Sequence, residues 1–234
     1  MRLSQFIAHA GVCARRKAAH LILKGNIKIN GHRVTDLSYQ VTAVDVVTYG
    51  DKVLTTEKKA YLLFNKPLDT ITTAHDPMGR RTVMDFFNKE MGERLYPVGR
   101  LDRKTTGIIL ITNDGALAHK LSHPSSEVPK VYMVTLKENL SQRALQRIKE
   151  GIMLKDGLAK VDEITAMGNL KTFRLRIHSG KNRIIRRIFG ALGCTLAALE
   201  RVQYAHLKKG NLPLGRWRPL TEEELRSFRE QGGR

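Results

Sequence analysis

The side chains with the clearest chemical potential lie between Tyr96 and Gly115. One carboxylate, Asp102, stands there among three cations, which are Arg100, Arg103 and Lys104. The apolar run at 108–111 predicts a buried strand, so the aspartate would be held at the mouth of that strand. Neighbouring cations favour the ionised form of a carboxylate, and a held, ionised carboxylate can attack carbon or accept a proton. The spacing alone leaves open a surface loop whose aspartate pairs with its own arginines.

A phosphate-binding loop of the nucleotide-binding type fits the same residues badly. The pattern between Gly99 and Lys104 lacks its second glycine, and the lysine comes one residue early. After the apolar run, Asn113 or Asp114 is placed to cap the next helix.

Two further segments carry candidate functional side chains. Residues 130–136 alternate as in a strand, which places Tyr132 on the same face as Lys130. A ring in that position can stack on an extruded base, a contact worth about 1–3 kcal/mol, or it can be an ordinary core tyrosine. Residues 180–189 predict a helix with an apolar face, and another face carries three arginines, namely Arg183, Arg186 and Arg187. Such a group can bind phosphates or pair with a buried carboxylate.

The overall charge indicates a polyanionic partner. The 234 residues include 41 Lys and Arg against 22 Asp and Glu, a formal net charge of +19. Because neutralising phosphates releases counterions and adds affinity, this charge favours nucleic acid.

Two distant cysteines, Cys13 and Cys194, argue against a disulfide scaffold or a zinc site and fit a reducing cytoplasm. No apolar run approaches the roughly 20 residues of a membrane span.

The first 35 residues hold seven Lys and Arg and no acidic residue, as in an organelle transit peptide. Their regular pattern instead predicts a small folded domain, with helices ending at Gly11 and Gly25 and a hairpin turning at Asn30–Gly31. The second helix begins with three cations, Arg15, Arg16 and Lys17, which oppose the helix dipole by about 0.3–1 kcal/mol each. A phosphate backbone lying across them would offset that cost.

The motif around Asp102 resembles that of a known family. The segments Gly99-Arg-Leu-Asp102, Thr106-Gly-Ile-Ile-Leu110 and Thr112-Asn-Asp-Gly115 are similar to the catalytic motif of the RsuA-type ribosomal RNA pseudouridine synthases. That resemblance implies that Asp102 is the catalytic residue, that Tyr132 stacks on the target base, and that Arg186 pairs with Asp102. Isomerising a uridine oxidises nothing and imports no group, so neither a metal nor a cofactor is expected.

The resemblance extends to the domain organisation. It implies an α+β chain with an S4-like RNA-binding domain at 1–58, a mixed-sheet catalytic domain at 59–228 and a tail at 229–234, in which we expect fraying from Gly232 onward. The polar segment 55–59 has the composition of a linker. Ala14 stands where the family usually has a helix-capping serine, whose loss costs about 0.5–2 kcal/mol.

A predicted strand at 61–64 runs into an Asn-Lys-Pro turn at 65–67, which in the family lies beside the RNA. Asp69 replaces the usual glycine there, and aspartate tolerates a left-handed backbone. Lys66 judged alone would be an unremarkable surface lysine. The basic loop at 76–81 is a second expected RNA contact, and a short helical stretch follows it at 82–87.

Other positions concern metal binding and RNA contacts. His119 and His123 are spaced to face one metal, but no further ligand stands nearby, so no metal site is predicted. Ile184 and the segment 203–206 depart from the family pattern, which bears on substrate contacts more than on the chemistry. The residues expected to contact RNA are Arg15, Arg16, Lys17, Lys28, Asn30, Lys66, Arg100, Arg103, Lys130, Arg183 and Arg187.

Together these observations predict a cytoplasmic, monomeric enzyme that isomerises a uridine of ribosomal RNA. The segment 213–220 favours the large-subunit 23S RNA over the 16S RNA of the small subunit. Two other classes stay open: a noncatalytic RNA-binding ribosome-assembly factor, for which the charge and the amino-terminal domain suffice, and an RNA nucleosidase, which would release free uracil.

Overall fold

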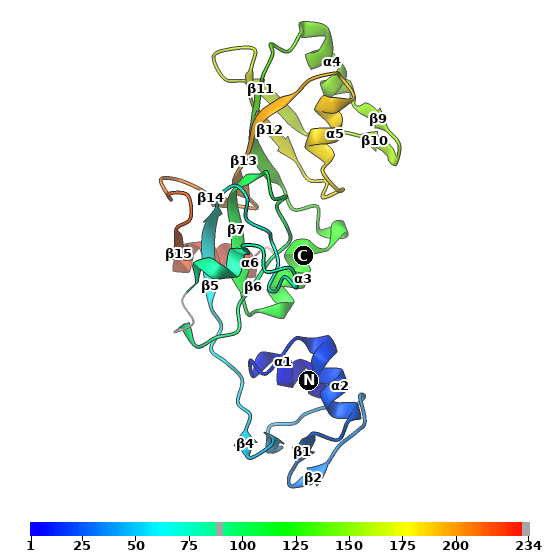
Figure 1. Cartoon of the computed structure of the whole chain (residues 1–234), viewed down its shortest axis with the longest axis vertical. Helices are drawn as coiled ribbons and strands as arrows, with labels where there is room; N and C mark the ends of the chain where they lie inside the picture. The colour runs from blue at the N-terminus through cyan, green and yellow to red at the C-terminus, as the bar shows by residue number, and fades with distance from the viewer. Residues whose placement is uncertain (88–90, 231–234) are drawn as a thin grey trace. The chain divides into compact units, whose positions relative to one another are not determined.

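The computed structural model describes residues 1–87 and 91–230, and the chain forms two compact units (Figure 1). One unit comprises Met1–Ala60 and Lys89–Leu95, and the other comprises Tyr61–Asn88 and Tyr96–Arg234. The predicted linker at 55–59 ends beside the division after Ala60. The fraying expected from Gly232 onward lies outside the described residues.

In the first unit, two helices pack against a small sheet. The helices are α1 (Leu3–His9) and α2 (Arg15–Leu23), and the strands, in the order β2-β1-β3-β4, are β1 (Ile27–Ile29), β2 (His32–Arg33), β3 (Val47–Tyr49) and β4 (Lys52–Val53). Leu3, Ile7 and Ile22 are fully buried against the strand residue Ile27. Asn30 and Gly31 have φ of 51° and 85°, which confirms the predicted tight turn.

The amino terminus of α2 carries exposed cations, as the sequence predicts. Ala14 has an extended backbone there and forms no side-chain cap, and the first turn of the helix contains no acidic residue. Arg15, Arg16 and Lys17 are all exposed. The backbone N–H groups of this first turn, which no side chain caps, and the three cations together make this helix end attractive to an anion.

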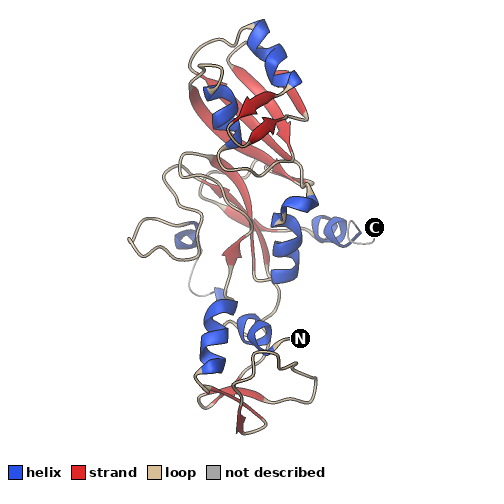
Figure 2. Cartoon of the chain, turned by 90° about the vertical axis from the view of Figure 1, so that its right-hand side faces the viewer, coloured by secondary structure: helices blue, strands red, loops and turns tan. Residues whose placement is uncertain are grey.

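The second unit is built on a single mixed sheet of nine strands (Figure 2). Its main path runs β11-β12-β8-β13-β7-β5-β15, with β14 paired to β13 and β6 to β7. Only the β7–β13 pair among these named strands is parallel, so the predicted α+β class with a mixed sheet is correct. The strands are β5 (Tyr61–Lys66), β6 (Tyr96–Pro97), β7 (Thr106–Thr112), β8 (Lys130–Leu136), β11 (Glu163–Ala166), β12 (Thr172–Ile177), β13 (Leu196–Tyr204), β14 (Leu207–Lys208) and β15 (Trp217–Pro219).

Helices and one hairpin complete this unit. They are η1 (Val83–Phe86), α3 (Gly115–Ser122), η3 (Pro124–Ser126), α4 (Gln142–Glu150), α5 (Ile184–Gly190), α6 (Glu222–Glu230) and the hairpin of β9 (Ile152–Leu154) with β10 (Gly157–Ala159). Asp114 caps α3 by accepting hydrogen bonds from the backbone of Ala116 and Leu117. Among the described residues no helix combines the length and the apolar composition needed to cross a bilayer.

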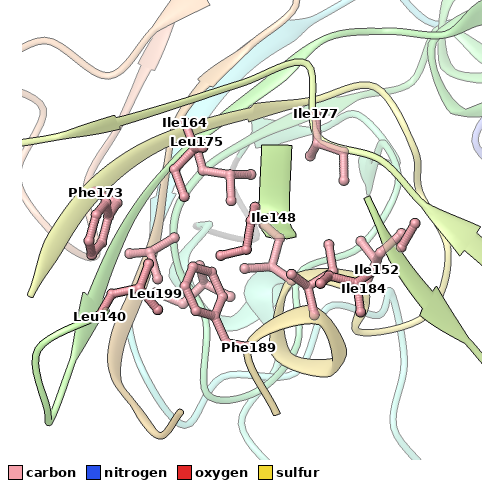
Figure 3. Packing of buried hydrophobic residues seen from close by; sticks show 14 of the residues in the cluster. Leu140, Ile148, Ile152, Ile164, Phe173, Leu175, Ile177, Ile184, Phe189 and Leu199 are labelled. Carbon is pink, nitrogen blue, oxygen red and sulfur yellow. The ribbon is translucent and has the colours of Figure 1, made fainter. Parts of the chain in front are cut away.

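Two apolar cores hold the sheet to its helices. In the first core, Ile148 of α4 and Phe189 of α5 lie against strand residues such as Leu199, as Figure 3 shows. The second core joins Leu110 of β7 to Leu121 of α3 and Phe228 of α6. The predicted apolar face of the helix at 180–189 therefore exists.

Two predicted boundaries are wrong. The strand expected at 61–64 continues through Lys66, because Asn65 and Lys66 pair with Ile108 and Gly107 of β7. The helix expected from Gly180 begins at Ile184, since Arg183 has φ of 49° and leaves the helical region.

The parallel pairing of β7 with β13 depends on Gly107. Its φ is +107°, and a Cβ atom built there would lie 2.2 Å from the carbonyl oxygen of Arg201. The two backbones could not remain at this distance with any other residue at that position.

We therefore expect Gly107→Ala to lower the free energy of unfolding by roughly 3 kcal/mol or more, through backbone strain and overpacking together. Gly168→Ala is the matched control, because its φ is +77° but a Cβ there meets nothing within 4 Å; we expect a loss of about 1–2 kcal/mol from strain alone. Urea unfolding followed by the fluorescence of Trp217, the single tryptophan, measures both. Equal losses would contradict the assigned role of Gly107.

Candidate active site

Asp102 lies on the loop that connects β6 to β7. The backbone N–H of Thr105 donates to the carbonyl oxygen of Asp102 at 3.0 Å, which closes a turn just before β7 begins. The carboxylate is 39% exposed. It lines a cavity of about 620 Å³ that also receives side chains from β8, β13 and the segment leading into α5. The aspartate is therefore presented to solvent from a fixed base, as predicted.

The neighbouring segment 67–72 holds this loop in place. The hydroxyl of Thr72 donates to the carbonyl of Leu101 at 2.8 Å and accepts from the N–H of Leu101 at 3.2 Å, and both partners are buried. The N–H of Asp69 donates to the carbonyl of Arg103 at 3.0 Å, and the carboxylate of Asp69 accepts from Nε of Arg103 at 3.0 Å. These bonds fix the residues on both sides of Asp102. Asp69 adopts φ of 54°, the left-handed backbone expected of it.

Lys66 is not a surface lysine, so that expectation is wrong, and its side chain has no exposed area with which to reach RNA. Its ammonium donates to the carbonyls of Pro67 at 2.8 Å, Thr70 at 2.9 Å and Arg103 at 3.4 Å. Burial lowers the pKa of Lys66 to about 8, while Asp102 and Asp69 act in the opposite direction. Lys66 thus joins the turn to the loop with Asp102 from inside the protein.

Arg186 approaches the loop from α5. Its Nη2 donates to the carbonyl of Lys104 at 2.6 Å and to the hydroxyl of Thr105 at 3.3 Å, and its Nε lies 3.9 Å from Oδ2 of Asp102. The guanidinium is 18% exposed. The buried residues Ile185 and Phe189 orient the helix, so the predicted pairing of Arg186 with Asp102 is a contact of the folded chain.

Tyr132 lies in the middle of β8 and lines the same cavity. The ring is half-buried and packs against the core beneath α5. Lys130, two residues earlier on the same face, donates to the carbonyl of His178 at 2.6 Å. Burial, reinforced by Arg201, lowers the pKa of Lys130 to about 8, while Asp162 opposes the shift.

This arrangement supplies three functions in one cavity. The carboxylate of Asp102 can attack carbon or accept a proton, the guanidinium of Arg186 can attract that carboxylate from 3.9 Å, and the ring of Tyr132 can support a planar base. Within residues 1–87 and 91–230 no group of three or more His, Cys, Asp or Glu side chains is arranged to hold a metal ion. His123 uses its Nδ1 for the hydroxyl of Ser125 at 2.7 Å.

Comparison with known proteins identifies the family. The model of the RNA pseudouridylate synthases matches residues 60–191, which contain Asp102, Tyr132 and Arg186. The chain belongs to this family. A second model, that of the S4 domain, matches residues 1–47. The enzyme is therefore an RNA pseudouridine synthase with an amino-terminal S4 domain, and the resemblance seen in the catalytic motif is confirmed.

Several relatives of the synthase share nearly its whole length. It is 40% identical over 233 residues to the ribosomal large subunit pseudouridine synthase B of Bacillus subtilis (strain 168), covering 97% of this chain and 95% of that one. It is 38% identical over 230 residues to an uncharacterized RNA pseudouridine synthase of Aquifex aeolicus (strain VF5), covering 96% and 92%. A crystal structure of a pseudouridylate synthase matches with a TM-score of 0.70 and 30% identity, over 97% of this chain and 99% of that one.

The other predicted contact residues of the synthase fall into two groups. Arg100 and Arg183 line the cavity with free access to it. Arg103 pairs with Asp69, and Arg187 forms a bidentate ion pair with Asp156 at 2.7 and 3.1 Å, so both guanidiniums already have a carboxylate partner.

The predicted RNA-contact residues of the first unit likewise fall into an accessible group and one already bonded within the fold. Lys28 is exposed, as are the three cations of α2. Asn30 instead uses its amide within the fold, donating to Asp45 at 3.2 Å and accepting from the N–H of Val46 at 2.9 Å.

Sequence reasoning missed two residues that shape the site, Thr72 and Arg201. Nothing in the local sequence distinguishes Thr72 from Thr73, because its role arises from the distant Leu101. Arg201 could have been noticed as a lone cation in the otherwise strand-like segment 196–204. The structure buries it to 2% exposure at the wall of the cavity.

We expect Thr72→Val to reduce kcat roughly 100-fold with little change in RNA affinity. Valine fills the same space but leaves the N–H and carbonyl of Leu101 unpaired, so Asp102 moves out of position, and small misplacements have effects of this order. Single-turnover assays and RNA titrations measure the two quantities. Thr73→Val is the control, because its hydroxyl donates to the carbonyl and accepts from the N–H of His75, an exposed residue away from the loop with Asp102. Similar rates for both variants would contradict this role of Thr72.

We also expect kcat/KM for RNA to be level from mildly acidic to neutral pH and to fall as the pH rises above about 8. Lys66 and Lys130, each with a pKa of about 8, are charged below that pH and lose their protons above it. The cavity then loses positive charge and attracts RNA less strongly. Arginine keeps its proton in this range, so Lys130→Arg should have a shallower alkaline decline. A profile identical to that of the wild type would exclude Lys130 as a contributor.

Proposed function

We propose that this synthase converts a specific uridine of the large-subunit 23S ribosomal RNA to pseudouridine, with Asp102 as the acting carboxylate. The observation that carries the proposal is the cavity shared by Asp102, Tyr132 and Arg186. The reaction must break the bond between N1 of uracil and C1′ of ribose, turn the base over, and join C5 to C1′. It therefore needs an anion near the sugar and a surface that retains the detached base.

Each of the three side chains has one task in this proposal. Asp102 attacks C1′ or takes the proton from C2′, and both routes are compatible with its position. Arg186, at 3.9 Å, holds the carboxylate oxygen toward the cavity. Tyr132 stacks on the uracil after the nucleotide has left its helix, since a base inside a duplex is inaccessible to chemistry at its glycosidic bond.

RNA recognition is divided between the two units in this proposal. Residues 1–58 hold the phosphate backbone through Arg15, Arg16, Lys17 and Lys28, and residues 59–228 receive the target nucleotide through Arg100, Lys130 and Arg183. The net charge of +19 supports a contact with many phosphates. We further propose that the enzyme acts as a monomer in the cytoplasm, where the free Cys13 and Cys194 stay reduced.

The large-subunit substrate is supported by the Bacillus subtilis relative, whose name specifies that subunit. An RNA nucleosidase would use a similar carboxylate, but it must admit water to C1′ and release uracil. The half-buried ring of Tyr132 favours retention of the base instead.

The test is pseudouridine mapping of ribosomal RNA from cells with and without the gene, rescued by the wild type or by Asp102→Asn. We expect one modification of 23S RNA to disappear and only the wild type to restore it, while Asp102→Asn keeps its RNA affinity because the substitution preserves shape. Restoration by Asp102→Asn would overturn the role of Asp102. A lost site in 16S RNA would move the substrate to the small subunit, and free uracil in the reaction would indicate a nucleosidase.

A further inference from the structure

Arg201 is a cation buried to 2% exposure at the wall of the cavity. Its Nε donates to the carbonyl of Ile108 at 2.8 Å, and its guanidinium carbon lies 4.7 Å from the centre of the Tyr204 ring. Nη2 is buried and has no hydrogen-bond partner within residues 1–87 and 91–230. Among the residues that the structure describes, no carboxylate lies within 4 Å of the guanidinium, unlike that of Arg186. Burying a charge in this way is strongly unfavourable, so packing alone does not account for it.

The register of the sheet places this cation beside the ring assigned to the base. Arg201 of β13 lies directly opposite Tyr132 of β8, and directly opposed residues of an antiparallel pair project from the same face. Both residues line the cavity that contains Asp102. The register of β13 shifts between Arg201 and Gln203, an irregularity that commonly redirects a side chain next to an active site.

The charge of Arg201 acts on its surroundings. It contributes to the lowered pKa of Lys130, and it opposes the rise that burial causes in the pKa of Tyr204. The carboxylates that line the cavity are Asp102, which lies near Arg186, and Glu127. Because Arg201 is only 2% exposed, solvent screens its charge less than that of a surface arginine, and the charge acts on the part of the cavity next to Tyr132.

The reaction creates a matching negative charge. When the C1′–N1 bond breaks, its electron pair leaves with the uracil, whose charge spreads over N1, O2 and O4. C5 then bonds to C1′, the proton leaves C5, and N1 takes up a proton, so the net change is an isomerisation. Between these two steps the detached base is an anion.

We propose that Arg201 stabilises this uracil anion while the base rests on Tyr132, and so lowers the barrier to glycosidic cleavage. The inference rests on the proposed function, because it needs the base to be stacked on that ring. A fixed cation aimed at the place where charge develops is an effective form of catalysis, and removing one such group commonly slows the reaction roughly 100-fold or more.

The test varies the leaving group. An RNA fragment centred on the uridine found by mapping is prepared with uridine or with 5-fluorouridine, whose base is more acidic and forms its anion more easily. Single-turnover loss of the nucleoside is measured for the wild type, Arg201→Gln, Arg201→Lys and the control Arg174→Gln, which removes a partly exposed cation of β12 that lies 3.8 Å from Glu163. RNA affinity and thermal unfolding are measured for each protein.

We expect Arg201→Gln to slow conversion of uridine roughly 100-fold, with a clearly smaller loss on 5-fluorouridine. Arg201→Lys should recover part of the rate, and Arg174→Gln should resemble the wild type. Equal losses on both nucleosides would overturn the inference and leave Arg201 a structural residue. If Arg201→Gln does not fold, Arg201→Lys carries the same comparison, with the smaller loss again expected on 5-fluorouridine. An inactive wild type would instead refute the proposed function.

Discussion

The catalytic unit depends on the close parallel contact between β7 and β13. Gly107 permits it, because any side chain there would collide with the backbone of Arg201. The contact joins the core beneath α5, which contains Leu199, to the core beneath α3, which contains Ile108. It also sets the positions of the functional groups: the loop with Asp102 enters β7 just before Gly107, and Tyr132 lies on the far side of β13. One strand pairing therefore determines how far the carboxylate stands from the ring.

The cations of this unit are held in two different ways. Lys66, Lys130, Arg186 and Arg201 donate to main-chain carbonyl groups, which fix the side chain without neutralising its charge, although Arg186 also lies 3.9 Å from the carboxylate of Asp102. Arg103 and Arg187 instead pair with Asp69 and Asp156. The first four surround the cavity and the loop at its edge, so this region keeps a positive potential toward an incoming phosphate or a developing anion. The carboxylate pairs give the surrounding loops their shape.

The features that sequence alone predicted are those set by local chemistry. The alternating segment at 130–136 is the strand β8, Asn30–Gly31 forms the hairpin turn, Asp114 caps α3, and Asp69 takes the left-handed backbone. Each of these depends on the residue itself or on neighbours a few positions away. The motif around Asp102 also indicated the family, and the family resemblance implied which residues accompany the carboxylate.

The features that sequence could not predict depend on distant atoms. The burial of Lys66 needs acceptors from Thr70 and Arg103, which only the folded loop brings together. Arg183 begins no helix because its backbone turns left, although arginine is an ordinary helix former. Whether a carboxylate lies near Arg201 depends on several segments that are distant in the sequence, so no local pattern of residue types can predict it.

The first unit is built from two separate segments of the chain, and this has a consequence for how the domains of such enzymes can be exchanged. Residues 91–95 belong to it although the second unit flanks them in the chain, and both oxygens of Glu57 accept from the N–H of Arg94. The first unit is thus not a separable module that one cut near residue 60 would release. Recombination at that point would replace residues 1–60 but leave residues 91–95, which pack in the original first unit, in the chain. Exchange of this unit therefore requires coordinated change at two places in the gene.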